Sequence, residues 1–291
     1  MKQQIEDFTK YLLEVKQSSM NTIRAYRNDL SKLESFLRKQ GIENAAKITE
    51  TSLNSYVLSL EKENMSPSSV SRHIASMKAF LLYLLKNGSI KGDPSERIKP
   101  PKVVKKSPQV LEEDKILAIL NQPNIKTSKG IRDKAMLELL YATGMKVSEL
   151  VNLKLSDVNL SGKYVTCGDK NERSIPFGNA SKDALNAYLK IRNAAFDKKN
   201  NEYLFLNSHG EQLSRQGFWK ILKEYSKKAG IEGINPNMIR HSFAAHMIDN
   251  GADIGVVQKF LGHTDISTTQ LYLSYNYQNS REVYANTHPR A

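Results

Sequence analysis

The sequence predicts a mainly α-helical protein in two parts: an N-terminal helical bundle and a mixed α/β C-terminal domain with a small antiparallel sheet. Apolar residues recur at helical spacing through most of the chain. Two short runs, 164–167 and 173–176, instead have strand character and flank a glycine-containing turn at 168–171. A stretch rich in proline and lysine separates the two parts. The expected boundaries are 1–97, 98–110 for the linker, and 111–291.

The N-terminal part is predicted to form about four helices. Ser66 before Pro67 is typical of a helix start, because serine caps the first turn and proline fits its first position. Gly88 is typical of a helix end. The apolar face between them consists of Val70, Ile74, Met77, Phe80, Leu81 and Leu84.

The linker at 98–110 is expected to follow an extended path. Prolines at 100, 101 and 108 oppose helix formation. Its four lysines are Lys99, Lys102, Lys105 and Lys106. They suit a path along a phosphate backbone, although a plain solvated linker has the same composition.

The C-terminal part is predicted to be helices around one hairpin. The expected helices cover 112–121, 131–142, 181–196, 215–229, 236–249 and 254–261. Gly144 is expected to end the second of them. We expect Ser267 to cap a last helix that carries Tyr272.

The charge of the chain favours a polyanionic partner. The 291 residues include 43 Lys and Arg against 30 Asp and Glu, a net charge of +13. Neutralising phosphates releases counterions, so nucleic acid is one candidate and a merely basic enzyme is the other. Cys167 is the single cysteine, which fits a reducing cytoplasm. The start has no apolar signal core, and the apolar cluster at 80–85 is too short to span a membrane.

Three residues near the C-terminus suit an attack on a phosphodiester. Arg240 can hold non-bridging oxygens, His263 can donate to another, and the Tyr272 hydroxyl can be the nucleophile. Asn237 lies one helical turn before Arg240, where both can address one phosphate. Taken alone, an arginine more often forms a salt bridge, a histidine more often caps a helix or lies on the surface, and a tyrosine is more often a half-buried aromatic. We see no cluster suited to a metal and expect no cofactor.

Five motifs and the N-terminal half resemble tyrosine recombinases of the phage integrase family, Xer type. The C-terminal motifs are 141–150 (YATGMKVSEL), 240–244 (RHSFA), 250–253 (NGAD), 261–263 (LGH) and 267–269 (STT), which leads to Tyr272. The N-terminal likeness is carried by Asn21, Thr22, Tyr26 and 68–85. The resemblance implies a SAM-like core-binding domain followed by a tyrosine-recombinase catalytic domain.

The resemblance also implies a mechanism. Tyr272 attacks the scissile phosphate and forms a 3′-phosphotyrosyl link, which a 5′-hydroxyl later reverses. Arg240 and His263 stabilise the transition state, so no metal or nucleotide is needed. Lys170, on the hairpin turn, resembles the family's mobile lysine, which protonates the departing 5′-oxygen.

Two positions depart from the family pattern. Lys146 stands where the family has its first arginine, and lysine cannot make the bidentate fork. Losing one aligned donor costs about 3 kcal/mol at such a transition state. Asn237 stands where a histidine is usual, and its amide cannot shuttle a proton. The chain is therefore a slow enzyme, a DNA-binding relative without turnover, or a protein altered to arrest the reaction. A type IB topoisomerase uses similar chemistry and stays open as well.

The resemblance implies double-stranded DNA with specific half-sites as partner. It implies a dimer on each site, a tetramer in the synapse, and exchange of the C-terminal tail between protomers. No membrane partner is expected. The residues expected to contact DNA are Arg72, Arg215 and the linker residues Lys99, Lys102, Lys105 and Lys106. The helix that starts with Arg215 could instead be a solvated face over buried Phe218 and Trp219.

Overall fold

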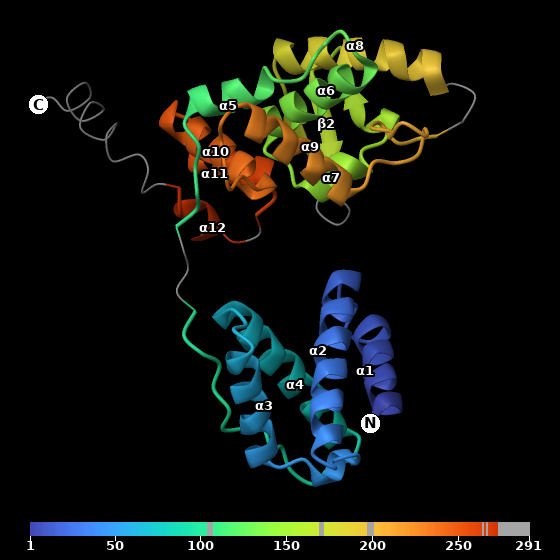
Figure 1. Ribbon diagram of the computed structural model, residues 1–291, viewed down its shortest axis with the longest axis vertical. Helices are drawn as coiled ribbons and strands as arrows, with labels where there is room; N and C mark the ends of the chain where they lie inside the picture. The colour runs from blue at the N-terminus through green and yellow to red at the C-terminus, as the bar shows by residue number, and fades with distance from the viewer. Residues whose placement is uncertain (104–106, 169–171, 197–200, 264, 266, 273–291) are drawn as a thin grey trace, which may run out of the picture. The chain divides into compact units, whose positions relative to one another are not determined.

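A computed structural model describes residues 1–103, 107–168, 172–196, 201–263, 265 and 267–272. The chain divides into two compact units, Met1–Lys106 and Ser107–Ala291 (Figure 1). Each unit has its own hydrophobic core, so each is described by itself.

The first unit is a helical bundle, as predicted. Its helices are α1 (Lys2–Glu14), α2 (Met20–Lys39), the short 3-10 helix η1 (Ala45–Lys47), α3 (Glu50–Lys62) and α4 (Pro67–Lys86). The Ser66 side chain accepts a hydrogen bond from the N–H of Ser69, and Pro67 occupies the first turn, which confirms the expected helix start. The predicted apolar face of α4 packs into the core with Leu30, Leu53 and other apolar side chains.

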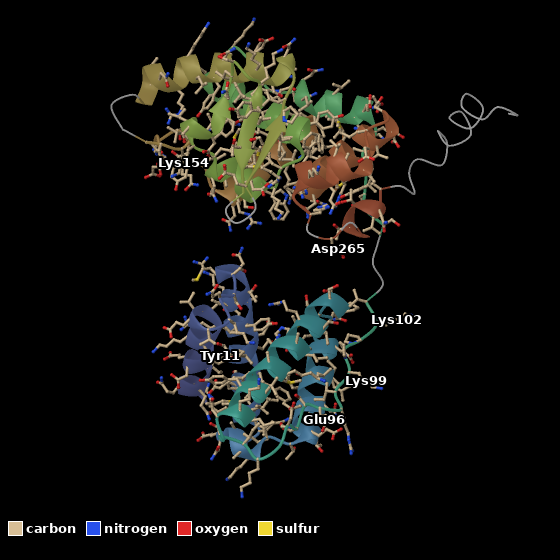
Figure 2. The ribbon with its side chains drawn as sticks, turned by 180° about the vertical axis from the view of Figure 1, so that it is seen from behind. Tyr11, Glu96, Lys99, Lys102, Lys154 and Asp265 are labelled. Atoms are coloured by element: carbon tan, nitrogen blue, oxygen red, sulfur yellow. The ribbon has the colours of Figure 1, made fainter. Side chains whose placement is uncertain are left out.

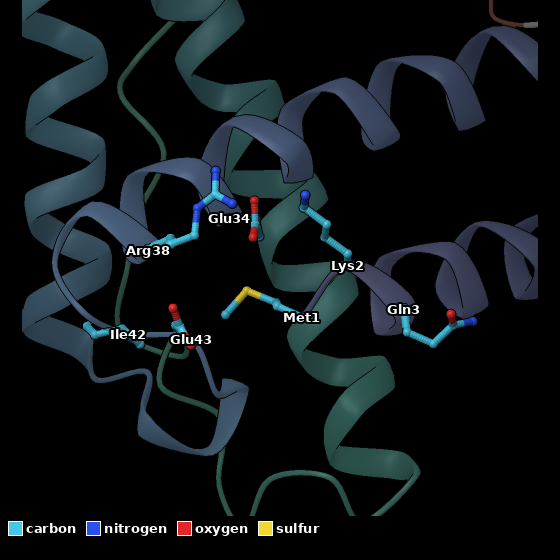
Figure 3. A pocket seen from close by; sticks show the side chains of 7 residues that line it. All are labelled: Met1, Lys2, Gln3, Glu34, Arg38, Ile42 and Glu43. Carbon is cyan, nitrogen blue, oxygen red and sulfur yellow. The ribbon is translucent and has the colours of Figure 1, made fainter.

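One pocket of this unit is a shallow hollow of about 340 Å³ where the start of α1 meets the end of α2. Figure 3 shows Glu34 and Arg38 of α2 on one side of it and Met1 and Lys2 on the other. Its lining mixes both signs of charge and includes none of the residues predicted to act in catalysis.

The second unit is built from helices around a small sheet. Its elements are α5 (Glu113–Leu120), α6 (Ser128–Thr143), α7 (Val147–Asn152), η2 (Leu155–Asp157), β1 (Val158–Asn159), β2 (Tyr164–Cys167), β3 (Arg173–Pro176), α8 (Asn179–Phe196), α9 (Arg215–Lys228), α10 (Pro236–Asp249), α11 (Ile254–Leu261) and α12 (Ser267–Gln270). Within the described residues the strands form one antiparallel sheet in the order β1-β2-β3. Val165 pairs with Val158 on one side and with Ile175 on the other.

Packing of the helices brings distant segments together at one end of the sheet. α6 lies against α8 and against α10 (Figure 1). α11 contacts α10, β3 and the short α12. Since α10, α11 and α12 carry the conspicuous motifs of the sequence, this packing assembles the residues predicted to act together.

The structure departs from the sequence expectations at three places. α6 begins at Ser128 rather than 131, because Thr127 caps it by accepting from the N–H of Gly130. The short elements η1, α7, η2 and β1 were not predicted. The expectation that Tyr272 lies on the last helix is wrong, because α12 ends at Gln270 and Tyr272 follows it in a turn.

None of the helices among the described residues has the length and apolar character needed to cross a membrane.

Candidate active site

Arg240 is the buried centre of the site. It lies on α10, and its side chain is 6% exposed. Its guanidinium donates to the Gly144 carbonyl at 2.8 Å and to the Leu261 carbonyl at 2.6 Å. These carbonyls belong to the ends of α6 and α11, where helix geometry leaves backbone acceptors unpaired. Arg240 therefore ties two helix ends to the middle of a third.

His263 follows the end of α11 and contacts Arg240 directly. Its Nε2 lies 3.0 Å from Arg240 Nη2, and its Nδ1 lies 2.9 Å from the Thr269 hydroxyl. Arginine can only donate, so Nε2 accepts and Nδ1 carries the proton. Burial, and then the positive charges of Arg240 and Lys146, lower the pKa of His263 to about 4. The imidazole is therefore neutral at pH 7.

Tyr272 is buried, with 2% of its surface exposed. Its ring packs with Phe243, Val257 and Leu261. Its hydroxyl lies 2.5 Å from Nδ1 of His241, the residue next to Arg240 on α10. Burial, together with the charge of Arg240, lowers the pKa of His241. A hydrogen bond with the His241 imidazole thus links the phenol of Tyr272 to α10.

An ion pair between Glu149 and Arg173 lies beside these residues. The guanidinium of Arg173 on β3 donates to both carboxylate oxygens of Glu149 on α7, at 3.0 and 2.8 Å. Arg173 Nε also donates to the Phe260 carbonyl at 2.6 Å. Glu149 in turn accepts from the backbone N–H of Lys146 at 2.8 Å. The pair therefore connects the hairpin, the start of α7 and the end of α11.

Residues 109–279 match the model of the phage integrase family, and residues 5–88 match that of the phage integrase N-terminal SAM-like domain. The chain belongs to the phage integrase family. Tyrosine recombinase XerD of Staphylococcus saprophyticus is 42% identical over 99% of both chains. Tyrosine recombinase XerD of Listeria innocua is 41% identical over 99% of both chains. Tyrosine recombinase XerC of Roseiflexus castenholzii is 40% identical over 100% of this chain and 95% of the relative.

Solved structures of tyrosine recombinases have the same fold. The crystal structure of XerA recombinase is 27% identical, with a TM-score of 0.57 over 99% of both chains. XerH site-specific recombinase, crystallised with its palindromic difH substrate, has a TM-score of 0.74 at 20% identity, over 97% of this chain and 84% of that one. This likeness confirms the predicted fold class, a helical N-terminal domain and a mainly helical catalytic domain with a small sheet.

The remaining family positions are less central in this structure. Lys146 is exposed at the N-terminus of α7. Asn237 is exposed in the first turn of α10, whereas Arg240 on the same helix is buried, so the two side chains differ in environment. Lys170 lies outside the described residues.

Three participants in this site were not singled out from the sequence. His241 directly follows Arg240 within the motif at 240–244, and Glu149 lies within the motif at 141–150, so their placement in motifs was the available signal. Arg173 lies in the hairpin at a strand position, and nothing in its spacing indicated an ion pair across the fold.

The residues predicted to contact DNA differ in their surroundings. Lys99, Lys102 and Arg215 are exposed, and Figure 2 labels the two lysines on the segment that follows α4. The side chain of Arg72 is exposed as well, but its guanidinium donates to the buried carboxylate of Asp29 at 2.9 Å. Lys105 and Lys106 lie outside the described residues.

The possibility of a buried Trp219 is wrong, because its side chain is 46% exposed on α9. Phe218, the residue before it, is fully buried. Lys223 Nζ lies 4.7 Å from the centre of the Trp219 ring. The outward face of α9 therefore presents an indole among basic side chains.

Proposed function

We propose that this chain is a site-specific DNA recombinase that cuts and rejoins strands through a 3′-phosphotyrosyl intermediate on Tyr272. The observation that carries the proposal is a network in which His263 contacts Arg240, and Tyr272 contacts His241, the residue next to Arg240 on α10. A guanidinium, two imidazoles and a phenol from three segments thus lie together. In the cleavage step Tyr272 Oη bonds to phosphorus and the bond to the 5′-oxygen breaks. A proton must reach that oxygen, and Lys170 is the proposed donor.

Arg240 is proposed to neutralise the charge that builds on the non-bridging oxygens. It is already desolvated and held by two carbonyls, so little reorganisation is needed when the phosphate binds. His263 is neutral with a proton on Nδ1. Its Nε2 faces Arg240, which makes it a positioning partner of the guanidinium in the DNA-free protein.

Lys146 is proposed to supply the remaining positive charge. Its side chain is exposed, and its positive charge is one of those that lower the pKa of His263, which supports a role for Lys146 beside that histidine. A lysine provides a point charge without the planar fork of arginine, so we expect cleavage that is slow rather than absent. Asn237 is proposed to hydrogen-bond the phosphate without transferring a proton.

The alternative is a DNA-binding relative that no longer turns over, favoured by the same substitutions at positions 146 and 237.

Sequencing the DNA that co-purifies with the protein identifies its site, and a duplex of that site with a nick beside the scissile phosphate then traps any covalent complex. We expect a protein–DNA adduct on a denaturing gel, no adduct from Tyr272→Phe, and faster formation, by up to about a hundredfold, from Lys146→Arg. Absence of adduct from both the unchanged chain and Lys146→Arg with Asn237→His would leave DNA binding alone.

Double-stranded DNA is the proposed partner, with a dimer on each site and a tetramer in the synapse. A lambda integrase dimer has been crystallised on a core site and a lambda integrase tetramer on a Holliday junction, which supports this assembly. We propose contacts to phosphates by Lys99, Lys102, Arg72 and Arg215, and we place the protein in the cytoplasm with its DNA. The proposed exchange of the tail involves residues beyond 272, which lie outside the described part of the chain.

A further inference from the structure

We propose that His241 is a catalytic residue that removes the proton from Tyr272 as the phenol attacks phosphorus. The inference rests on the proposed function, because it requires Tyr272 to be the nucleophile. It assigns a role to a histidine that neither the spacing of the motifs nor the chemistry of Arg240 and His263 required.

The contact between the two residues is the first step of the argument. His241 Nδ1 and Tyr272 Oη lie 2.5 Å apart, a distance typical of a strong hydrogen bond. A general base must lie within hydrogen-bond reach of the proton it removes, and Nδ1 meets that condition before DNA arrives. The hydrogen bond runs from the phenol to the ring nitrogen when the imidazole proton is on Nε2.

The environment of His241 keeps the ring in the form that a base needs. It is half-buried on α10, directly after Arg240, whose fixed charge opposes a second positive charge nearby. Burial and that charge lower the pKa of His241 below its ordinary value, so the ring is neutral at pH 7 and Nδ1 has a free electron pair for the phenol proton.

The other candidates for this role are engaged differently or cannot perform it. Asn237 has an amide, which does not take up a proton near neutral pH. The two ring nitrogens of His263 face Arg240 and Thr269. Among the residues that the structure describes, His241 is therefore the imidazole shown to hydrogen-bond the nucleophile.

The proposed step balances. The proton of Tyr272 Oη moves to His241 Nδ1 while Oη bonds to phosphorus. The phosphorus–5′-oxygen bond breaks, and the 5′-oxygen takes a proton from the general acid, the role given above to Lys170. When a 5′-hydroxyl attacks in the second half, its oxygen bonds to phosphorus and its proton passes to the group that served as general acid in the first half. The bond from Oη to phosphorus breaks, and His241 returns its proton to the phenolate.

The test compares two histidines on α10 that each hydrogen-bond a tyrosine. His246 Nδ1 lies 2.8 Å from the hydroxyl of Tyr141, so His246→Gln is a matched control for His241→Gln. Both variants and the unchanged chain are mixed with the nicked duplex, and the rate of adduct formation is measured in a single turnover. We expect His241→Gln to be slower by about a hundredfold and His246→Gln to stay within about twofold.

Two further measurements separate a base from a structural support. His241→Ala leaves space beside the phenol, so added imidazole should restore adduct formation in proportion to its concentration. A duplex with sulfur in place of the bridging 5′-oxygen needs no proton on its leaving group. The His241→Gln defect should persist on that substrate, whereas a defect in leaving-group protonation would disappear.

Several results would overturn the proposal. These are adduct formation by His241→Gln at or above the unchanged rate, a defect that imidazole does not relieve in His241→Ala, or a defect that the sulfur substrate removes. Melting temperature and duplex affinity of each variant are measured alongside, and a failure of imidazole rescue in a folded, DNA-binding variant counts against the proposal. Failure of the proposed function is distinct, because the unchanged chain would then form no adduct.

Discussion

Two arginines at the site, Arg173 and Arg240, donate hydrogen bonds to main-chain carbonyls in addition to supplying positive charge. Arg173 donates to the Phe260 carbonyl and Arg240 to the next one, Leu261, so two guanidiniums hold the end of α11 immediately before His263. Arg173 has a carboxylate partner in Glu149, which is 15% exposed, whereas Arg240 is held by carbonyls and His263. The position of His263 therefore depends on one ion pair outside the set of predicted catalytic residues.

Replacing Glu149 by Gln should destabilise the second unit. Arg173 would keep its partly buried charge but lose the carboxylate, a change that costs about 2–3 kcal/mol, at or below the cost for a fully buried pair. Thermal unfolding at pH 7 should then shift down by roughly 5–10 °C.

Glu224→Gln is the matched control. Glu224 also meets two cations, Lys129 and Lys228, but it is 40% exposed, so its loss should cost at most about 1 kcal/mol. Equal shifts in melting temperature for the two variants would contradict a special role for the pair of Glu149 and Arg173.

His263 should make stability fall on mild acidification. Burial and nearby cations hold its folded pKa at about 4, below its ordinary value of 6.5. The unfolded chain therefore binds a proton between these values while the folded chain does not. Stability from this group is complete above pH 6.5 and is lost as pH falls toward 4.

Between pH 7 and pH 5 the contribution of His263 amounts to about 1 kcal/mol after allowance for solvent screening of a half-buried group. Denaturant unfolding at the two pH values should show a smaller loss for His263→Gln than for the unchanged chain. The same loss in both proteins would mean that this histidine is not held neutral by the fold.

Two helices of the second unit end in the same way next to the site. α6 closes at Gly144 with φ 58°, and α11 closes at Gly262 with φ 65°. A residue in the left-handed backbone conformation ends a helix and leaves the last carbonyls of that helix available as acceptors. Arg240 donates to one such carbonyl from each helix. The helix ends thus provide a polar frame for a buried cation.

Gly144→Ala should disturb this frame. An added Cβ would lie 2.1 Å from Cδ1 of Phe243, and the positive φ opposes a side chain as well. We expect a loss of about 2–3 kcal/mol in unfolding free energy and slower adduct formation, since the Gly144 carbonyl must move. Gly178→Ala, where no atom lies within 4 Å of the new Cβ, should leave both measurements near their original values.

At the scale of the whole molecule, the positive charge is spread over both units. Lys99 and Lys102 belong to the first unit and Arg215 to the second, and all three are exposed. Arg72 is oriented by Asp29, which is 3% exposed and lies close to His73 as well. A net charge of +13 on two units suits a protein that binds phosphates with both.

Salt dependence should report this binding to phosphates. Lys99→Gln with Lys102→Gln should reduce the slope of log affinity against log salt by roughly 2, about one for each phosphate that is no longer neutralised, and should weaken all duplex sequences alike. The control is Lys115→Gln with Lys129→Gln, two lysines already paired with Glu112 and Glu224. An unchanged slope for the first pair would remove those residues from the DNA-binding surface.

Most of the secondary structure and the family follow from the amino-acid sequence alone. Ser66 with Pro67, Gly144, and the strands on either side of the turn act over a few residues, so they can be recognised without knowing the fold. The hydrogen bonds and ion pairs of the site depend instead on how the helices pack. His241 and Tyr272 are 31 positions apart, and Glu149 and Arg173 are 24 apart, on segments that meet only in the folded chain. Local periodicity cannot reveal such pairs, because the free energy that brings them together comes from burying the cores rather than from the pairs themselves.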